Sequence, residues 1–187
     1  MTKILSTAPG RVCLFGDHQD YLELPVIACA IDRMMEIYAE ENGKDHLEIN
    51  MPDMNQKRII TLQEDFNEIE RGDFLKIALK VLQKRNIVPN RGFRLTISSK
   101  IPINAGLSSS SALTISWIQF LIAAFSERST SPKELALLAY ETEVIESGSS
   151  GGKMDQFTIA IGDTIFLDTN TDQVQKFNDL KLDLVVG

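Results

Sequence analysis

The sequence changes from strand-like to helix-like at Gly106-Leu107-Ser108-Ser109-Ser110-Ser111-Ala112. This stretch lies between a β-like run, residues 93–98, and an apolar run of helical length, residues 112–125. A glycine followed by small hydroxyl residues can hold an anion there, because glycine permits close backbone approach and the first helical N–H groups lack intrahelical partners. The same residues also suit an ordinary serine N-cap. On local sequence alone, phosphate binding and helix capping both remain open.

A second stretch carries polar groups close together, and it reads Ala8-Pro9-Gly10-Arg11-Val12-Cys13-Leu14-Phe15-Gly16-Asp17-His18-Gln19-Asp20-Tyr21. The carboxylates of Asp17 and Asp20 can accept hydrogen bonds from hydroxyl groups, while Arg11 and His18 can donate them. The stretch therefore suits a ligand with many hydroxyl groups. An ordinary turn with solvated charges is the alternative.

A third stretch, Ser149-Ser150-Gly151-Gly152-Lys153-Met154-Asp155-Gln156-Phe157, is a loop broken by glycines that brings Asp155 to the start of a helix-like run. An acid at this place can serve a reaction. It can equally be a charge that interacts favourably with the helix dipole.

The three stretches together, in this order, resemble the GHMP kinases, named for galactose, homoserine, mevalonate and phosphomevalonate. The likeness covers nearly the whole chain and is strongest to sugar kinases of the galactokinase type. Galactokinases typically read Ala-Pro-Gly-Arg-Val-Asn-Leu-Ile-Gly-Glu-His-Thr-Asp-Tyr, then Gly-Leu-Ser-Ser-Ser, then Gly-Ile-Met-Asp-Gln. The resemblance implies an α+β fold, the two-layer GHMP kinase N-terminal domain with a mixed or antiparallel sheet and packed helices. It also implies a left-handed βαβ crossover, an exception to the usual handedness.

The resemblance further implies ATP-dependent phosphoryl transfer to a sugar hydroxyl, expected to be the anomeric one, with Mg2+ as the metal. Asp155 takes the place of the catalytic aspartate, and Arg11 that of the arginine beside it. Glu143, twelve residues before Asp155, matches the metal-binding glutamate, and Ser110 is the expected hydroxyl ligand of Mg2+, with Ser109 as the alternative. The expected sugar-binding residues are Asp17, His18, Asp20 and Tyr21. The expected phosphate-binding residues are Gly106, Leu107, Ser108, Ser109, Ser110 and Ser111.

Three departures from the galactokinase pattern leave the substrate open. Asp17 stands where galactokinases usually carry Glu, and residues 22–24 replace an Asn-Gly-Gly-like stretch. Lys153 stands where galactokinases usually carry Ile. The resulting Gly-Gly-Lys-x-Asp-Gln pattern resembles that of kinases that act on bacterial heptose phosphates, so Lys153 is a further candidate site residue. Those kinases lack the His-x-Asp-Tyr pattern. Heptose-phosphate-type and mevalonate-type kinases remain alternatives, as does a catalytically silent sugar or nucleotide sensor.

Composition narrows the class of protein. The 187 residues are 43% hydrophobic, enough for one substantial core or two small ones. A formal charge of −7 and the lack of a basic run exclude a general nucleic-acid binder. Cys13 and Cys29 are expected to be free thiols in a reducing compartment. No signal peptide or membrane-length apolar run is seen, so a cytoplasmic protein without membrane contact is expected.

The periodicity of apolar residues predicts the individual elements. Helices are expected at residues 74–84 and 112–125, after Asp155, and after Ser131, where Pro132 and Glu134 complete a helix-start pattern. The expected strands are residues 4–7, 11–15, 26–31, 34–41, 46–51, 58–62, 93–98, 164–167 and 182–186.

We expect residues 1–187 to form one N-terminal, ATP- and substrate-binding domain. The second α/β domain of the GHMP kinases, with its glycine-rich third motif, is expected to be absent from this chain. The chain would then be a fragment, or the missing half would be a separate chain. The isolated fragment is expected to be inactive.

Overall fold

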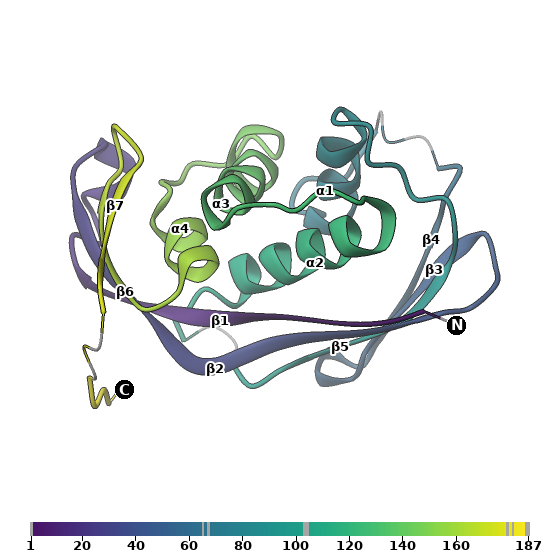
Figure 1. The fold of residues 1–187 in the computed structure, drawn as a ribbon, viewed down its shortest axis with the longest axis horizontal. Helices are drawn as coiled ribbons and strands as arrows, with labels where there is room; N and C mark the ends of the chain where they lie inside the picture. The colour runs from purple at the N-terminus through teal and green to yellow at the C-terminus, as the bar shows by residue number, and fades with distance from the viewer. Residues whose placement is uncertain are drawn as a thin grey trace.

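The computed structural model describes residues 2–64, 66, 68–102, 105–178, 180 and 182–185. Within these residues, seven strands form one sheet, and four α-helices lie on one face of it (Figure 1). In that view α2 runs along the sheet, with the other helices on the same side. The architecture is therefore two-layered, with one sheet and one helical layer.

The sheet is built around a long central strand. Its strands are β1 (Lys3–Phe15), β2 (Val26–Glu41), β3 (His46–Met51), β4 (Gln56–Thr61), β5 (Phe93–Ser99), β6 (Thr164–Asp168) and β7 (Gln173–Phe177). The order is β4-β3-β5-β2-β6-β7, and β1 pairs with β2. One half of β2 pairs with β5 and the other half with β6, while β1 pairs antiparallel along both halves. β3 and β5 are parallel, and the chain between them runs through β4 and α1 (Phe74–Gln83).

The two longest strands are each continuous where the sequence predicted two short pieces. The register of β1 against β2 shifts between Pro9 and Arg11, so an irregularity replaces the predicted break. Gly10 lies at this shift, and a Cβ there would meet the carbonyl oxygen of Leu107 at 3.0 Å. The missing side chain lets the serine loop approach β1, and Arg11 N–H donates to Leu107 O at 3.1 Å. The lack of a side chain at Gly10 therefore allows the first and second motifs to contact each other.

The described residues form four α-helices, two of which begin at a local capping side chain. They are α1, α2 (Ser109–Phe125), α3 (Pro132–Tyr140) and α4 (Met154–Ile161), with a π-helical segment, Glu141–Ile145, directly after α3. Ser131 caps α3 by accepting from Glu134 N–H, with Pro132 in the first turn, as predicted. Asp73 caps α1 by accepting from Lys76 N–H and is also paired with Arg58 of β4. That ion pair joins the helical layer to the edge of the sheet.

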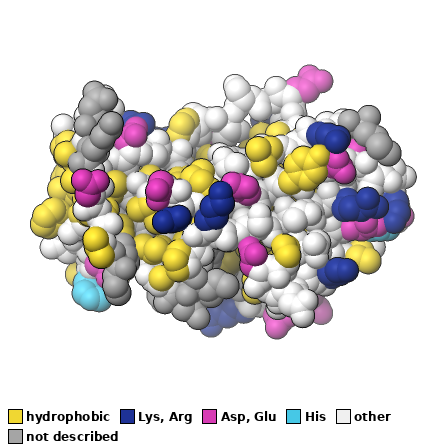
Figure 2. Space-filling model, turned by 90° about the horizontal axis from the view of Figure 1, so that it is seen from below, with side chains coloured by type: hydrophobic (Ala, Val, Ile, Leu, Met, Phe, Trp, Pro, Cys, Tyr) yellow, Lys and Arg dark blue, Asp and Glu magenta, His cyan; other side chains and the backbone are white. Residues whose placement is uncertain are grey.

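Among the described residues, the larger of two hydrophobic clusters lies between α2 and the sheet. Trp117 and Phe120 of α2 are fully buried, as is Phe93 of β5, and the burial of each such side chain contributes about 1.5–3 kcal/mol. Trp117 Nε1 donates to Leu75 O at 3.0 Å, which satisfies its buried polar atom and fixes α1 against α2. The outer face of the sheet is different, because exposed residues such as Arg94 and Thr96 alternate with buried ones along β5. Figure 2 shows acidic and basic side chains interspersed on that face.

One predicted strand is wrong. Residues 182–185 have no regular secondary structure, and Val186, the last residue of that prediction, lies outside the described residues. Instead, β7 pairs antiparallel with β6. Its sequence is mostly polar, because β7 lies at the edge of the sheet and buries little of its surface. In the described part of the chain, no helix is long and apolar enough to span a membrane.

Candidate active site

The three motifs meet at one cavity of about 280 Å3. It lies where the N-terminal ends of α2 and α4 face the loop that follows β1. The lining residues are Arg11, Asp17, Asp20, Phe74, Ser110, Ser111, Glu143, Val144, Ser149, Ser150, Gly151, Gly152, Met154, Asp155 and Gln156. Segments more than 100 positions apart in the sequence therefore build a single site.

The carboxylate of Asp155 is held at both of its oxygens. Arg11 Nε donates to Oδ1 at 2.7 Å, and Ser108 Oγ donates to Oδ2 at 2.5 Å. Arg11 Nη1 also donates to Gly106 O at 2.6 Å. Asp155 keeps 27% of its side-chain surface exposed, against 11% for Arg11. The carboxylate is thus oriented by two other motifs, and part of it still faces the cavity.

The first turn of α2 has an uncommon cap. Ser108 precedes the helix with φ 55° and ψ 47°, in the left-handed region, and its side chain makes no capping hydrogen bond. A serine at this position usually accepts from the N–H groups of the first turn. Here the hydroxyl is turned to Asp155 instead.

The predicted phosphate-binding residues divide into two groups. Ser110 and Ser111 line the cavity. Three other residues contact Arg11 and Asp155 instead. The carbonyl oxygens of Gly106 and Leu107 accept hydrogen bonds from Arg11, and the Ser108 hydroxyl donates to Asp155. Ser109 lies beside Ser110 in a neighbouring pocket.

That neighbouring pocket is mainly apolar and has a volume of about 240 Å3. Its lining residues are Met35, Met51, Asp53, Met54, Ile97, Ser98, Ser99, Ser109, Ser110 and Leu113. Because Ser110 lines both cavities, the apolar pocket and the acidic cavity adjoin at the first turn of α2. Together they offer an apolar site and a polar site on either side of a helix N-terminus.

Glu143 lies on the π-helical segment, and its side chain is buried with 6% exposure. Its carboxylate accepts hydrogen bonds from Ser111 Oγ and Thr114 Oγ1, each at 2.8 Å, and from Gln156 Nε2 at 2.5 Å. Burial raises the pKa of Glu143, and these three hydrogen bonds oppose the rise. Among the serines of the loop, Ser111 donates to the Glu143 carboxylate. Ser110, which was expected to bind the metal, is exposed at the cavity.

The oxygen atoms of Glu143 and Ser110 suit a Mg2+ ion that takes only a few of its ligands from the protein. Within the described ranges, no group of three or more His, Cys, Asp or Glu side chains is placed to hold a metal. Mg2+ commonly uses one or two carboxylates, together with phosphate oxygens and waters. Glu143 and Ser110 both line the cavity and offer hard oxygen atoms of this kind.

Asp20 is buried and accepts the N–H groups of Lys153 and Met154 at 2.9 and 3.1 Å. It therefore caps α4 from a distant segment while it lines the cavity. Burial raises its pKa, and the two backbone hydrogen bonds oppose that rise.

Besides residues 106–109 of the serine loop, the predicted site residues His18, Tyr21 and Lys153 do not line the cavity. His18 and Tyr21 are exposed and pack edge to face with ring centroids 6.4 Å apart. Lys153 donates to Asp172 Oδ1 at 2.6 Å and to Thr169 O at 3.2 Å, and its ammonium lies over the Tyr140 ring. Its charge is engaged away from Asp155.

Sequence reasoning missed Thr114 and Gln156, both of which contact Glu143. Thr114 follows Ser111 by three positions, so the two hydroxyls share one face of α2. That spacing was the available signal for Thr114. Gln156 follows Asp155 directly and is the last residue of the Met-Asp-Gln pattern, which was the available signal for it.

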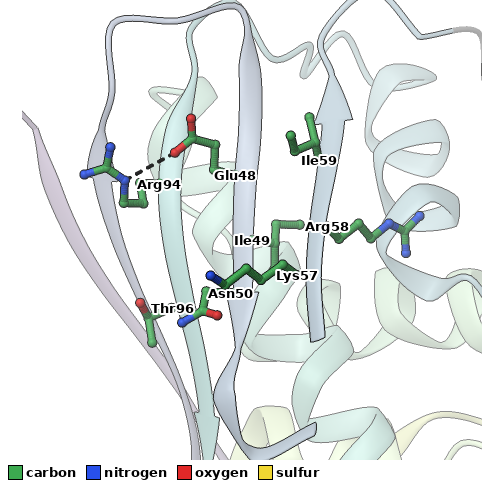
Figure 3. Close-up of a pocket in the computed structure, with 8 residues that line it drawn as sticks. All are labelled: Glu48, Ile49, Asn50, Lys57, Arg58, Ile59, Arg94 and Thr96. Carbon is green, nitrogen blue, oxygen red and sulfur yellow. Dashed lines mark hydrogen bonds and ion pairs between the residues drawn. The ribbon is translucent and has the colours of Figure 1, made fainter. Parts of the chain in front are cut away.

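A separate hollow of about 680 Å3 lies on the outer face of the sheet (Figure 3). It contains none of the three motifs, and Glu48, Arg58 and Arg94 of its lining each take part in an ion pair. Glu48 accepts from Lys44 and Arg94, and these contacts lower its pKa to about 2. We assign this hollow no role.

Comparison with known proteins identifies two family signatures in this chain. Residues 2–40 match the galactokinase galactose-binding signature, and residues 73–163 match the GHMP kinases N-terminal domain. The chain is 30% identical to a mevalonate kinase of Thermococcus sibiricus over 99% of this chain and 57% of the relative. It is 33% identical to a galactokinase of Thermococcus kodakarensis over 88% of this chain and 47% of the relative.

A solved structure shows the same architecture. The Lactococcus lactis galactokinase complexed with galactose superposes with a TM-score of 0.81 at 25% identity, over 92% of this chain and 46% of that protein. The chain spans about half the length of the relatives it matches.

Proposed function

Because this chain belongs to the GHMP kinase family, we propose that it binds ATP and a sugar and contributes the catalytic groups for phosphoryl transfer between them. The observation that carries the proposal is the position of Asp155. It lies at the N-terminus of α4, is held by Arg11 and Ser108, and faces the cavity.

The two adjoining cavities suit the two substrates. The apolar pocket beside Met51, Met54 and Leu113 would take the nucleoside of ATP. The first turn of α2 would hold its phosphates through backbone N–H groups and the helix dipole. The γ-phosphoryl group would then point past Ser110 into the acidic cavity.

Asp155 would orient the attacking hydroxyl and accept its proton. The hydroxyl oxygen forms a bond to the γ-phosphorus, the bond from that phosphorus to the ADP oxygen breaks, and the proton passes to the carboxylate. Arg11 would keep the carboxylate in place throughout. Glu143 and Ser110 would hold Mg2+, which neutralises phosphate charge when bound.

The charge of the cavity favours a neutral, polyhydroxylated substrate. Four carboxylates line it, from Asp17, Asp20, Glu143 and Asp155, and Arg11 is the one cation among the described lining residues. The Arg11 guanidinium is already engaged with Asp155 and Gly106 O. Carboxylates accept hydrogen bonds from sugar hydroxyls and repel an anion. A carboxylate substrate such as mevalonate would find no unengaged cation among these residues.

A mevalonate-type kinase is the second candidate, and the 30% identity to the Thermococcus sibiricus protein supports it. A catalytically silent sugar or nucleotide sensor is a third candidate, of a different class. The presence of Asp155, Arg11 and Glu143 together at the cavity favours an enzyme over a sensor.

We also propose that residues 1–187 act as an N-terminal domain that needs a second domain, in the same chain or a separate one, to close over the substrates. The span of about half of each relative supports this. The isolated chain would then be inactive. The free thiols of Cys13 and Cys29 are consistent with a reducing, cytoplasmic location.

The deciding experiment is ADP release by the full-length protein over a panel of sugars, with mevalonate and homoserine as controls. A sugar kinase gives turnover with one or more sugars and none with mevalonate. Asp155→Asn should then lose about a hundredfold or more in kcat, because the group that accepts the proton is gone, while sugar affinity changes less. Turnover with mevalonate alone would support the second candidate, and binding of sugar or ATP without turnover would support the sensor.

A further inference from the structure

We propose that Ser108 is a positioning residue for Asp155, and that its hydroxyl group serves this carboxylate and not the phosphates of ATP. This inference rests on the proposed function, because it gives Asp155 its role in phosphoryl transfer. It changes the role of the first serine in the loop. The expected phosphate contact at this position is replaced by a contact to the reacting carboxylate.

The Ser108 hydroxyl is directed at Asp155 and not at the first turn of α2. Ser108 Oγ donates to Asp155 Oδ2 at 2.5 Å across 47 positions of sequence. The side chain makes no hydrogen bond to the first turn of α2, although serine at an N-cap usually does so. Ser108 also lines neither of the two adjoining cavities, whereas Ser110 lines both.

The backbone conformation of Ser108 is also uncommon for a serine. Ser108 has φ 55°, a left-handed conformation that glycine adopts more readily than a residue with a Cβ. Gly106, two positions earlier, has φ 69°, and glycine meets the same requirement there. A serine in this conformation is strained, and such strain is typical of residues whose side chain has a task at a site.

The two carboxylate oxygens of Asp155 accept hydrogen bonds from different donors. Arg11 Nε occupies Oδ1 at 2.7 Å, and the Ser108 hydroxyl occupies Oδ2. Arg11 is itself fixed to the serine loop through Gly106 O. With one donor on each oxygen, rotation of the carboxylate about its χ2 bond is restricted. Without Ser108, only the Arg11 contact would orient it.

Two variants separate the hydroxyl from the backbone. Ser108→Gly and Ser108→Ala both remove the donor, but only Ala keeps a Cβ in the left-handed conformation. In the full-length protein we expect the same loss of kcat in both, roughly tenfold to a hundredfold, the scale of a misplaced catalytic group. The KM for ATP should stay unchanged. The melting temperature of the Gly variant should exceed that of the Ala variant.

Asn86 provides a matched control, because it is exposed, has φ 62° and lies outside both cavities. Asn86→Gly and Asn86→Ala should differ in melting temperature in the same sense, with kcat unchanged in both. A rise in the KM for ATP with kcat retained in the Ser108 variants would overturn the proposal and make Ser108 a phosphate ligand. Equal melting temperatures for the two Ser108 variants would overturn the argument from backbone strain.

A crystal structure of the Ser108→Ala variant tests the positioning role without an activity assay. The expected result is a rotated or disordered Asp155 carboxylate with Arg11 still in place. An unmoved carboxylate would overturn the positioning role. If the wild-type protein transferred phosphate to no substrate in the panel, the proposed function would fail, and this structure would still decide what Ser108 does.

Discussion

The carboxylate of Asp20 lies against the backbone of Gly152, so closely that a Cβ on Gly152 would come within 2.0 Å of Asp20 Cγ. This approach lets Asp20 accept the N–H groups of Lys153 and Met154 and so cap α4 across 133 positions of sequence. The helix that carries Asp155 therefore starts at a point set by the first motif. Asp20 acts on the site through α4 as well as through the cavity.

Gly152→Ala tests this close approach. The new methyl group would overlap the carboxylate of Asp20, which must move and release the start of α4. We expect a loss of about 1–3 kcal/mol in the free energy of unfolding, as for other overpacked sites. Gly151→Ala is the matched control, because its Cβ would meet Val144 Cγ2 at 3.4 Å, an ordinary contact. Urea unfolding of both variants measures the difference, and equal stabilities would contradict the overlap.

The raised pKa of Asp20 predicts a dependence of stability on pH. The folded state holds the proton of Asp20 more tightly than the unfolded state, whose pKa is near 3.8. The contribution of Asp20 to stability is therefore full below that pH and is lost as pH rises through the folded-state pKa. Asp20→Asn cannot titrate, so its stability relative to wild type should improve over this range. Urea midpoints of both proteins at a series of pH values check this, and parallel curves would refute it.

Glu143→Gln tests the metal site. The Ser111 and Thr114 hydroxyls can donate or accept, so the amide should fit without loss of the fold. Removing the charge should raise the Mg2+ concentration needed for half-maximal activity by roughly tenfold or more, and Ser110→Ala should raise it less. Glu146→Gln is the control, because Glu146 pairs with Lys80 and Lys84. An unchanged Mg2+ dependence in the Glu143 variant would leave that acid a purely structural role.

Lys153→Ala tests whether this lysine belongs to the substrate site. Its contacts with Asp172, Thr169 and the Tyr140 ring are structural, so we expect a stability loss of about 1 kcal/mol. Sugar and nucleotide affinities, measured by isothermal titration, should not change. If Lys153 instead held the phosphate of a sugar phosphate, the variant would lose affinity for that substrate and keep its affinity for unphosphorylated sugars.

Local features of this protein could be predicted from the sequence because they depend on neighbouring residues. The cap at Ser131 and the helix of residues 74–83 follow from side chains within one or two turns. The three motifs could also be recognised, since each is a short contiguous run. The predicted strand at residues 182–186 failed for the converse reason, because an apolar run forms a strand only where a sheet edge is available to pair with it.

The packing of distant segments determines which groups of the motifs face one another. From the motifs alone, Asp155, Arg11 and the serines could be assigned to one site, and the family and its two-layer fold could be identified. The motifs did not determine that Ser108 donates to Asp155, that Asp20 caps α4, or that Lys153 turns to Asp172. Each of these contacts joins segments brought together by packing. Their geometry depends on close backbone approaches at Gly10 and Gly152, which only the folded chain creates.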